Sequence, residues 1–319
     1  MSQMDISVIV VSYNTAGLLE QCMGDLRSAI DARLKVEIVF VDNASKDNSV
    51  EVIRTKFPEC KLIENDKNIG FGRGNNQALP FVTGRYILLL NTDAFVAPDT
   101  LSKTMAYMDA NPRCGILGVR LEGRDGVLQP SCRYFPTPWN TFLRRTGLNR
   151  SFAGTRMVDD MTWPHDAVRS CDWVVGCYYL LRREVVDDIG LFDPRYFLYF
   201  EEVDHCFAAK RNGWNIVFFP HTTVIHLGGE SAKTVGAVTK SGQQLERLQI
   251  ESELLYFRKN FGLASVIGSV LLSVLADIFN MTKRAFKPGV PLDLKGALQH
   301  IALVVSTLFR TRFATHATR

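Results

Sequence analysis

Four short apolar runs in the N-terminal part of the chain constrain the fold more than any other feature. They alternate with stretches in which apolar residues recur at helical spacing, such as residues 16–33. The runs are Ile6 to Val11, Val36 to Val41, Lys61 to Ile63 and Tyr86 to Leu90. Continuous apolar strands that alternate with helices are typical of a parallel sheet covered by helices on both faces. The sequence therefore predicts an α/β fold.

A cluster of polar side chains follows each of these predicted strands. In open α/β sheets the ligand lies outside the carboxyl ends of the strands, so we expect the clusters to converge on one cleft. The clusters are Ser12-Tyr13-Asn14, Asp42-Asn43-Ala44-Ser45, Glu64-Asn65-Asp66 and Asn91-Thr92-Asp93.

The glycine-rich stretch from Asn68 to Asn76 follows the third strand. It is not a dinucleotide fingerprint, because those glycines belong directly after the first strand. Its glycines allow backbone N–H groups to approach a phosphate, and Arg73 adds a positive charge. The alternative is a plain glycine-rich turn before a helix.

Two residues are candidates for binding a divalent cation. Asp93 lies at the tip of a predicted buried strand, where a carboxylate must be paired, solvated or bound to a cation. The apolar run Ile216 to Phe219 predicts a further strand, and His226 follows it in a predicted loop, before Gly228 and Gly229, that can reach the cleft. A Mg²⁺ or Mn²⁺ ion that bridges a diphosphate would satisfy Asp93. The alternatives are a helix cap for Asp93 and a structural role for His226.

The segment from Tyr199 to Trp214 predicts a short helix that begins with acidic residues. Glu201 and Glu202 follow an aromatic stretch, Tyr196 to Phe200, that would place them beside apolar walls. Desolvation there raises a carboxylate pKa and makes the group a usable base. The alternative is that these acids only complement the helix dipole on a solvated face.

Charge and cysteine content indicate where the protein works. The chain has a net charge of +4, and residues 263–319 hold seven Lys or Arg against two acids. Such a basic, apolar tail on a nearly neutral body favours a membrane surface over nucleic acid. The seven cysteines are scattered and form no CxxC motif, which indicates reduced, buried thiols in a cytosolic protein. We expect no signal peptide.

The tail itself shows two amphipathic runs, one from Leu263 and one from Leu294. Only 14 uncharged residues precede Asp277, fewer than the roughly 20 that span a bilayer. We therefore expect interfacial helices over 263–319 beside a catalytic domain over 1–262. The alternative is that the helices pack on the catalytic domain or in a homodimer. Between Arg120 and Ser170 we expect irregular structure around an acceptor site.

Six motifs, taken in order, resemble the family 2 inverting glycosyltransferases of the GT-A fold, a mixed, Rossmann-like sheet flanked by helices. The resemblance covers roughly residues 5–262 and is closest to bacterial rhamnosyltransferases of polysaccharide and O-antigen assembly. The motifs are VIVVSYN, VDNAS-DNS, N-NIGFG-GNN, LLLNTDA, VVGCYYLLRRE–GLFDPRYFLYFEEVD and HLGGES.

The resemblance implies roles for individual residues. The nucleoside would contact Ser12, Tyr13, Asn14, Asp42 and Asn43, and the nucleotide sugar would contact Asn68, Gly70, Phe71, Gly72 and Asn75. Asp93 would be the metal-binding acid of the Asp-x-Asp signature, in which this chain has Asn91 in place of the first aspartate. Glu202 matches the base, with Glu201 beside it as the other candidate.

The implied reaction is a single displacement in which an acceptor hydroxyl attacks the anomeric carbon of the donor. We expect L-rhamnose transfer from dTDP-rhamnose to a polyprenyl-diphosphate-linked saccharide at the cytoplasmic face of the bacterial inner membrane. A UDP-hexose or UDP-N-acetylhexosamine donor is the alternative. A nucleotidyltransferase would carry a glycine-rich basic loop after the first strand, which this sequence lacks. A non-catalytic membrane scaffold of the same fold is a further, less favoured alternative, since such a protein would be expected to have lost its acids at 93, 201 and 202 and none is missing.

Overall fold

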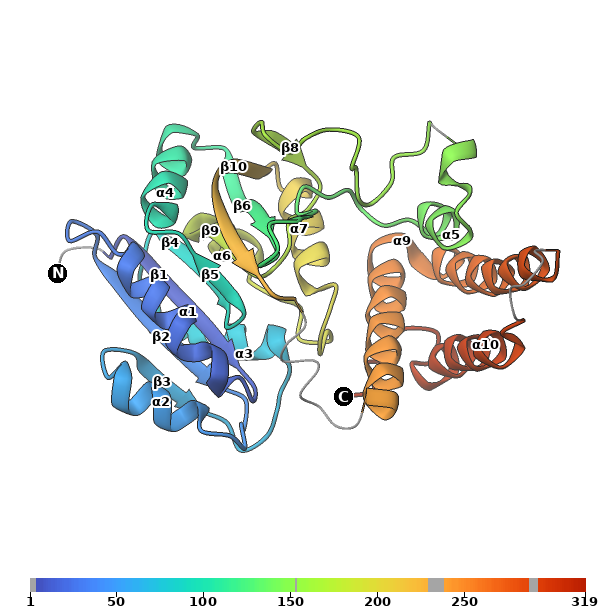
Figure 1. The fold of residues 1–319 in the computed structure, drawn as a ribbon, viewed down its shortest axis with the longest axis horizontal. Coiled ribbons are helices and arrows are strands. Elements are labelled where there is room, and N and C mark those ends of the chain that lie inside the picture. Colours follow the sequence, from blue (N-terminus) through green and yellow to red (C-terminus); the bar gives the residue numbers. More distant parts are fainter. Residues whose placement is uncertain (1–3, 153, 229–237, 287–291) are drawn as a thin grey trace.

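The computed structural model describes residues 4–152, 154–228, 238–286 and 292–319. Within them, ten strands form one mixed sheet in the order β3-β2-β1-β4-β9-β6-β10-β5, with β7 on β6 and β8 on β10 (Figure 1). The strands are β1 (Ile6–Ser12), β2 (Val36–Asp42), β3 (Lys61–Glu64), β4 (Tyr86–Asn91), β5 (Ala94–Val96), β6 (Cys114–Glu122), β7 (Leu128–Gln129), β8 (Arg169–Cys171), β9 (Tyr178–Arg182) and β10 (Asn215–His226). The predicted α/β fold is confirmed.

Helices cover both faces of the sheet, and each face has its own apolar core. The helices α1, α2 and α4 pack on one face, and α3, α6, α7 and the first half of α9 pack on the other. The helices are α1 (Ala16–Ala29), α2 (Ser49–Lys56), α3 (Phe71–Ala78), α4 (Thr100–Ala110), α5 (Pro138–Thr146), α6 (Arg183–Ile189), α7 (Glu201–Arg211), α9 (Val238–Ala285) and α10 (Leu294–Arg310). All seven cysteines are buried and none is in a disulfide, as expected.

The registers of the four N-terminal strands align their carboxyl ends. Strands β1, β2, β3 and β4 are parallel, with Ser12 opposite Asp42 and Val11 opposite Asn91. The polar residues that follow these strands therefore meet at one edge of the sheet. The prediction that all four clusters converge on one cleft holds only in part, because Glu64, Asn65 and Asp66 at the end of β3 do not line the cavity at this edge.

Part of the segment expected to be irregular is helical. Helix α5 begins at Pro138, a position that tolerates proline because the first N–H of a helix has no intrahelical partner. Thr137 and Asn140 form a reciprocal capping box at this end, and Gly147 ends the helix in a left-handed conformation. The prolines and aromatic residues around α5 hid this helix in the sequence.

The tail begins with one long helix that bends sharply at Gly262, which has φ 81°. Before the bend, α9 packs along α7, and Lys259 Nζ lies 2.6 Å from Asp204 Oδ2 and 2.9 Å from Asp193 Oδ2. After the bend, α9 forms a separate helical lobe with α5 and α10 (Figure 1). The helical segment Gln244–Ala285 is long and apolar enough to cross a membrane by length and composition alone. The 14 uncharged residues before Asp277 did not indicate so long an apolar helix.

Candidate active site

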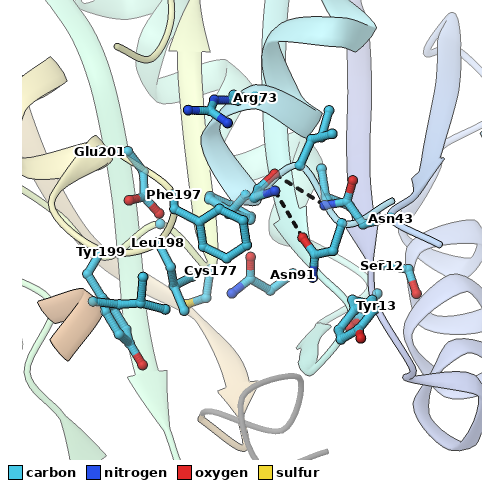
Figure 2. Close-up of a pocket in the computed structure, with 18 of the residues that line it drawn as sticks. Ser12, Tyr13, Asn43, Arg73, Asn91, Cys177, Phe197, Leu198, Tyr199 and Glu201 are labelled. Carbon is cyan, nitrogen blue, oxygen red and sulfur yellow. Dashed lines mark hydrogen bonds between the residues drawn. The ribbon is translucent and has the colours of Figure 1, made fainter. Parts of the chain in front are cut away.

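The carboxyl edge of the sheet opens into a cavity of about 610 Å³. Figure 2 shows part of its lining, which comes from the loops after β1, β2 and β4, from α3, from the start of α7 and from the tail. Most of the residues predicted for the site line this cavity: Ser12, Tyr13, Asn43, Asn68, Gly70, Phe71, Arg73, Asn91, Asp93, Glu201, Glu202 and His226.

Four predicted residues, all within the described part of the chain, lie outside this lining: Asn14, Asp42, Gly72 and Asn75. Asn14 and Asp42 hold the loops after β1 and β2 in place. The Asn14 side-chain oxygen accepts from the Lys46 N–H at 2.7 Å, and Asp42 Oδ2 accepts from the Ser45 N–H at 2.8 Å. Asn75 is buried and donates to the backbone of its own helix. Asn14, Asp42 and Asn75 therefore stabilise elements that form the cavity wall.

The glycine stretch packs against the segment that precedes α7. Gly70 has φ 93°, and a Cβ there would lie 2.5 Å from the Phe197 carbonyl oxygen, so only glycine fits. The Phe71 N–H donates to the same oxygen at 3.0 Å. Asn43 Nδ2 donates to the Gly70 carbonyl at 3.2 Å, and Asn68 Oδ1 accepts from the Gly70 N–H at 2.9 Å (Figure 2). Two walls of the cavity are thereby fixed to each other.

Arg73, predicted to contact phosphate, lies at the rim with part of its guanidinium already engaged. Its Nε donates to the Pro194 carbonyl at 2.7 Å, and its Nη2 donates to the main-chain oxygen of Arg319 at 2.8 Å. Arg73 therefore joins the glycine stretch to the tail as well as adding charge to the cavity.

A strained turn sets the start of α7. Both Tyr199 and Phe200 have a positive φ, in a left-handed conformation that is uncommon outside glycine. Two such residues in succession persist only where the surrounding structure fixes them, and they are found mostly at functional sites. The turn makes Glu201 the first residue of α7 and Glu202 the second, and both line the cavity.

The two adjacent glutamates differ in their surroundings. Burial raises the pKa of Glu201 well above its usual range, and the charge of Glu202 raises it further. Burial also raises the pKa of Glu202, but backbone N–H groups, including that of Gly176, and the Arg133 guanidinium oppose this rise. On each glutamate, Oε2 has no hydrogen-bond partner among the described residues. Glu202 is therefore the member of the pair that ionises more readily.

Asp93 and His226 meet at the far side of the cavity, with His226 Nε2 3.7 Å from Asp93 Oδ1. His226 is the last residue of β10, opposite Ala94 on β5, so its predicted place in a loop was wrong. The prediction ended this strand at Phe219, but β10 continues past Pro220 through a register shift. The residues from Gly229 to Ser231 of the same motif lie outside the described residues.

The surroundings of His226 prepare it to bind a cation. Burial lowers the pKa of His226, although Asp93 opposes the shift, so the ring is neutral at neutral pH. Gln129 Nε2 donates to the His226 carbonyl, and this bond fixes the orientation of the Gln129 amide so that Gln129 Oε1 accepts from His226 Nδ1 at 2.8 Å. His226 Nε2 is then the unprotonated ring nitrogen, and its lone pair lies on the Asp93 side. Within the described part of the chain, no group of three His, Cys, Asp or Glu side chains is arranged to hold a metal.

Several lining residues had no signal in the sequence. Val175, Gly176 and Cys177 come from the segment just before β9. Leu245, Leu248 and Arg319 come from the tail, far along the chain from the first strand. Their place in the cavity depends on how the tail folds back, which local sequence patterns do not describe.

Known proteins resemble both the sequence and the fold. Residues 7–164 match the family model described as glycosyl transferase family 2. A curated relative, the N-acetylglucosaminyl-diphospho-decaprenol L-rhamnosyltransferase of Mycobacterium tuberculosis (strain ATCC 25618 / H37Rv), is 25% identical over 250 residues, covering 69% of this chain and 75% of the relative.

Two solved structures share the fold. The mannosyltransferase PcManGT from Pyrobaculum calidifontis, solved with GDP-Man and Mn²⁺, superposes with a TM-score of 0.57 at 15% identity, covering 99% of this chain and 89% of that one. S. aureus TarS 1-349, solved with UDP-GlcNAc, superposes with a TM-score of 0.55 at 17% identity, covering 97% of this chain and 80% of that one.

The mixed sheet, with its cavity at the carboxyl edge, has the GT-A fold of these two structures, and the family-model match over residues 7–164 makes the protein a glycosyltransferase. The chain belongs to glycosyl transferase family 2, and it is similar to bacterial rhamnosyltransferases within that family.

Proposed function

We propose that this glycosyltransferase is an inverting enzyme that moves L-rhamnose from dTDP-rhamnose to a polyprenyl-diphosphate-linked saccharide in bacterial surface polysaccharide synthesis. The observation that carries the proposal is the pair of glutamates at the start of α7, which lines the same cavity as the glycine stretch. Inversion by single displacement needs one base and no covalent intermediate. The transferred sugar and the diphospho-lipid acceptor follow the name of the M. tuberculosis relative, and the dTDP carrier follows the resemblance of the sequence motifs.

Glu202 is the proposed base. Its carboxylate form is favoured over that of Glu201 by Arg133 and by backbone N–H groups, while burial keeps its pKa above the usual value. A carboxylate whose pKa is raised accepts a proton more readily than an ordinary glutamate, which is what general base catalysis requires. Glu201, buried and with the higher pKa, would remain protonated beside it and would not repel the base.

The residues present fit one divalent cation. Asp93 Oδ1 and His226 Nε2 lie 3.7 Å apart. This separation is less than twice the Mg²⁺–ligand distance of about 2.1 Å, so one ion can touch both atoms. The buried Asn91 Oδ1 has no partner among the described residues, and Asn91 lines the same cavity. A bound Mg²⁺ or Mn²⁺ would neutralise charge on the departing diphosphate.

The helical lobe is proposed to bind the cytoplasmic membrane surface. After Gly262, the buried side of α9 holds the polar residues Ser269 and Asp277 beside apolar Val266 and Val270, and Asp277 pairs with Arg145 of α5 and with His300 of α10. Other apolar residues of the lobe are more than two fifths exposed: Leu263, Leu271, Leu275 and Ile278 on α9, and Leu298 and Phe309 on α10. An exposed apolar surface of this kind is suited to lipid.

An interfacial position fits this lobe better than a membrane span. The first half of α9 is held on the catalytic domain by the Lys259 contacts with Asp204 and Asp193, so it cannot lie in lipid at the same time. The exposed basic residues Lys283, Arg284 and Lys295 lie on the lobe and suit anionic headgroups. The membrane would then hold the lipid-linked acceptor near the cavity.

The test uses purified full-length protein with an N-acetylglucosaminyl-diphospho-polyprenol acceptor. Each of dTDP-rhamnose, UDP-galactose and UDP-GlcNAc is supplied in turn, and release of nucleoside diphosphate is measured with and without acceptor. We expect acceptor-dependent release of dTDP, and little from Glu202→Gln. Release from a UDP sugar alone would refute the rhamnosyl donor, and no release from any donor would refute the proposed function.

A further inference from the structure

The segment that follows α10 returns to the catalytic domain. We call residues 311–319 the C-terminal strap. The turn that redirects the chain contains three successive residues with positive φ, namely Arg312, Phe313 and Ala314. Thr311 is fully buried, and its Oγ1 accepts from the Ala314 N–H at 3.0 Å. A conformation this unfavourable is kept only where the surrounding contacts require it.

A buried carboxylate on α9 anchors the far end of the strap. Glu251 is only 5% exposed, and a carboxylate buried in this way needs hydrogen-bond donors. Its Oε1 accepts from the Thr318 N–H at 2.6 Å, and its Oε2 accepts from Thr318 Oγ1 at 2.7 Å. Both oxygens of Glu251 are therefore used to fix the residue next to Arg319.

The anchored strap places Arg319 in the lining of the cavity. Its guanidinium lies over the ring of Phe197, 5.1 Å from the ring centroid, and its main-chain oxygen accepts from Arg73. The Gln244 side-chain oxygen, in the amide orientation that satisfies both groups, accepts from Nη2 at 2.9 Å and Nη1 at 3.3 Å. Phe197 is the residue whose carbonyl holds the glycine stretch.

Part of the hydrogen-bonding capacity of the Arg319 guanidinium has no acceptor among the residues that the structure describes. An arginine has five N–H groups, and Gln244 takes two of them. Among the residues that the structure describes, no carboxylate forms an ion pair with Arg319. Other lining residues add three acids, Asp93, Glu201 and Glu202, and two cations, Lys67 and Arg73. Arg319 adds a further cation, which helps to balance the acids when an anionic substrate binds.

We propose that Arg319 binds phosphate oxygens of a diphosphate-bearing substrate and that the C-terminal strap positions Arg319 for this contact. The guanidinium fork matches phosphate geometry, whereas the sugar parts of the substrates are neutral. The proposal rests on the proposed function, in which both the donor and the acceptor carry a diphosphate. The experiment separates these two sources.

The test compares wild type with Arg319→Ala, Arg319→Lys and the control Arg310→Ala, which removes the same charge from α10 outside the cavity. Calorimetry measures the Kd for inorganic pyrophosphate, for dTDP and for a short-chain N-acetylglucosaminyl-diphospho-lipid. Steady-state rates give the KM for each substrate. Loss of a charged hydrogen bond predicts an affinity for pyrophosphate about tenfold weaker in Arg319→Ala. Arg319→Lys should recover part of it, and Arg310→Ala should match wild type.

The source of the phosphate is identified by which substrate's KM rises along with the Kd for pyrophosphate. A higher KM for the nucleotide sugar assigns Arg319 to the donor, and a higher KM for the lipid assigns it to the acceptor. Equal pyrophosphate affinity in wild type and Arg319→Ala overturns the proposal, whether or not the melting temperature changes. The binding measurements do not need turnover, so a wild type that binds pyrophosphate through Arg319 but transfers no sugar would refute the proposed function alone.

A second variant tests whether the C-terminal strap positions Arg319. Thr318→Pro removes both donors to Glu251 while leaving Arg319 in the sequence. If the strap positions Arg319, this variant should weaken pyrophosphate binding to nearly the same extent as Arg319→Ala. Unchanged pyrophosphate affinity in Thr318→Pro would overturn the role of the strap.

Discussion

Replacing Glu202 with glutamine should abolish most transfer while leaving donor binding intact. A general base contributes on the order of 10²- to 10⁴-fold to a rate, which is about 2.7–5.5 kcal/mol of transition-state free energy. Glutamine keeps the size of the side chain and most of its packing against Gly176, so the loss belongs to proton transfer. We therefore expect kcat to fall by at least about 100-fold with the Kd for dTDP unchanged.

The pH dependence gives the same prediction a second readout. Catalysis needs the carboxylate form, so the rate rises with pH through the pKa of Glu202. Burial raises that pKa. The midpoint of the acid limb of kcat/KM should therefore lie above the ~4.3 of an ordinary glutamate. Glu201→Gln mimics a protonated Glu201, so this control should keep the rate within about tenfold and should not raise the midpoint.

The assay is initial-rate release of dTDP between about pH 4.5 and 8.5, a range chosen to cover the expected midpoint, with melting temperatures to confirm that each variant is folded. An inactive Glu201→Gln variant together with an active Glu202→Gln variant would show that Glu201, and not Glu202, is the base. Near wild-type rates in both variants would refute a carboxylate base at the start of α7.

Three further predictions concern the cation, the glycine stretch and the tail. Asp93→Asn should weaken dTDP binding in Mg²⁺ or Mn²⁺ and remove most activity. Gln129→Leu should weaken dTDP binding less than Asp93→Asn does, by about tenfold, because Gln129 only orients His226. Full activity of the wild-type protein in excess EDTA would contradict both of these predictions. Gly70→Ala should lower the free energy of unfolding by about 2 kcal/mol, the cost of a strained backbone and a close contact. Gly126→Ala, also at positive φ but with open space around it, should cost less, and equal costs would show that the contact with Phe197 is unimportant. Replacing the exposed Leu271 and Leu275 with serine should lower binding to anionic liposomes by at least about tenfold. The control Val127→Ser, at an exposed position on the catalytic domain, should not lower it, and equal binding by all variants would place the membrane contact elsewhere.

The parts of the fold that the sequence predicted are those with a strong local period. The strands β1, β2 and β4 are buried on both faces, so they appear as continuous apolar runs, and their polar ends could be placed together because parallel strands share a carboxyl edge. Glu201 and Glu202 could be located for a similar reason, since they follow an aromatic segment and begin a helix.

The parts that were missed depend on contacts between distant residues. Pro220 interrupts the apolar pattern of β10, so the strand was expected to end early and His226 to lie in a loop. On α9, the helical period predicted an amphipathic helix, but it could not show that Asp277 would be buried beside Arg145 on the same side as Val266 and Val270. The place of Arg319 in the cavity depends on Glu251, which bonds Thr318 from 67 residues earlier, and no local pattern reports such a pairing.

The most direct test of the account is the anomeric configuration of the product. Wild-type protein, dTDP-rhamnose and the diphospho-lipid acceptor are combined, and the new glycosidic bond is examined by NMR. A single displacement with Glu202 as base predicts a product of inverted configuration, formed in step with dTDP release and absent with Glu202→Gln. A product that retains the configuration of the donor would contradict the account, because retention requires a second displacement for which the proposed site provides no step.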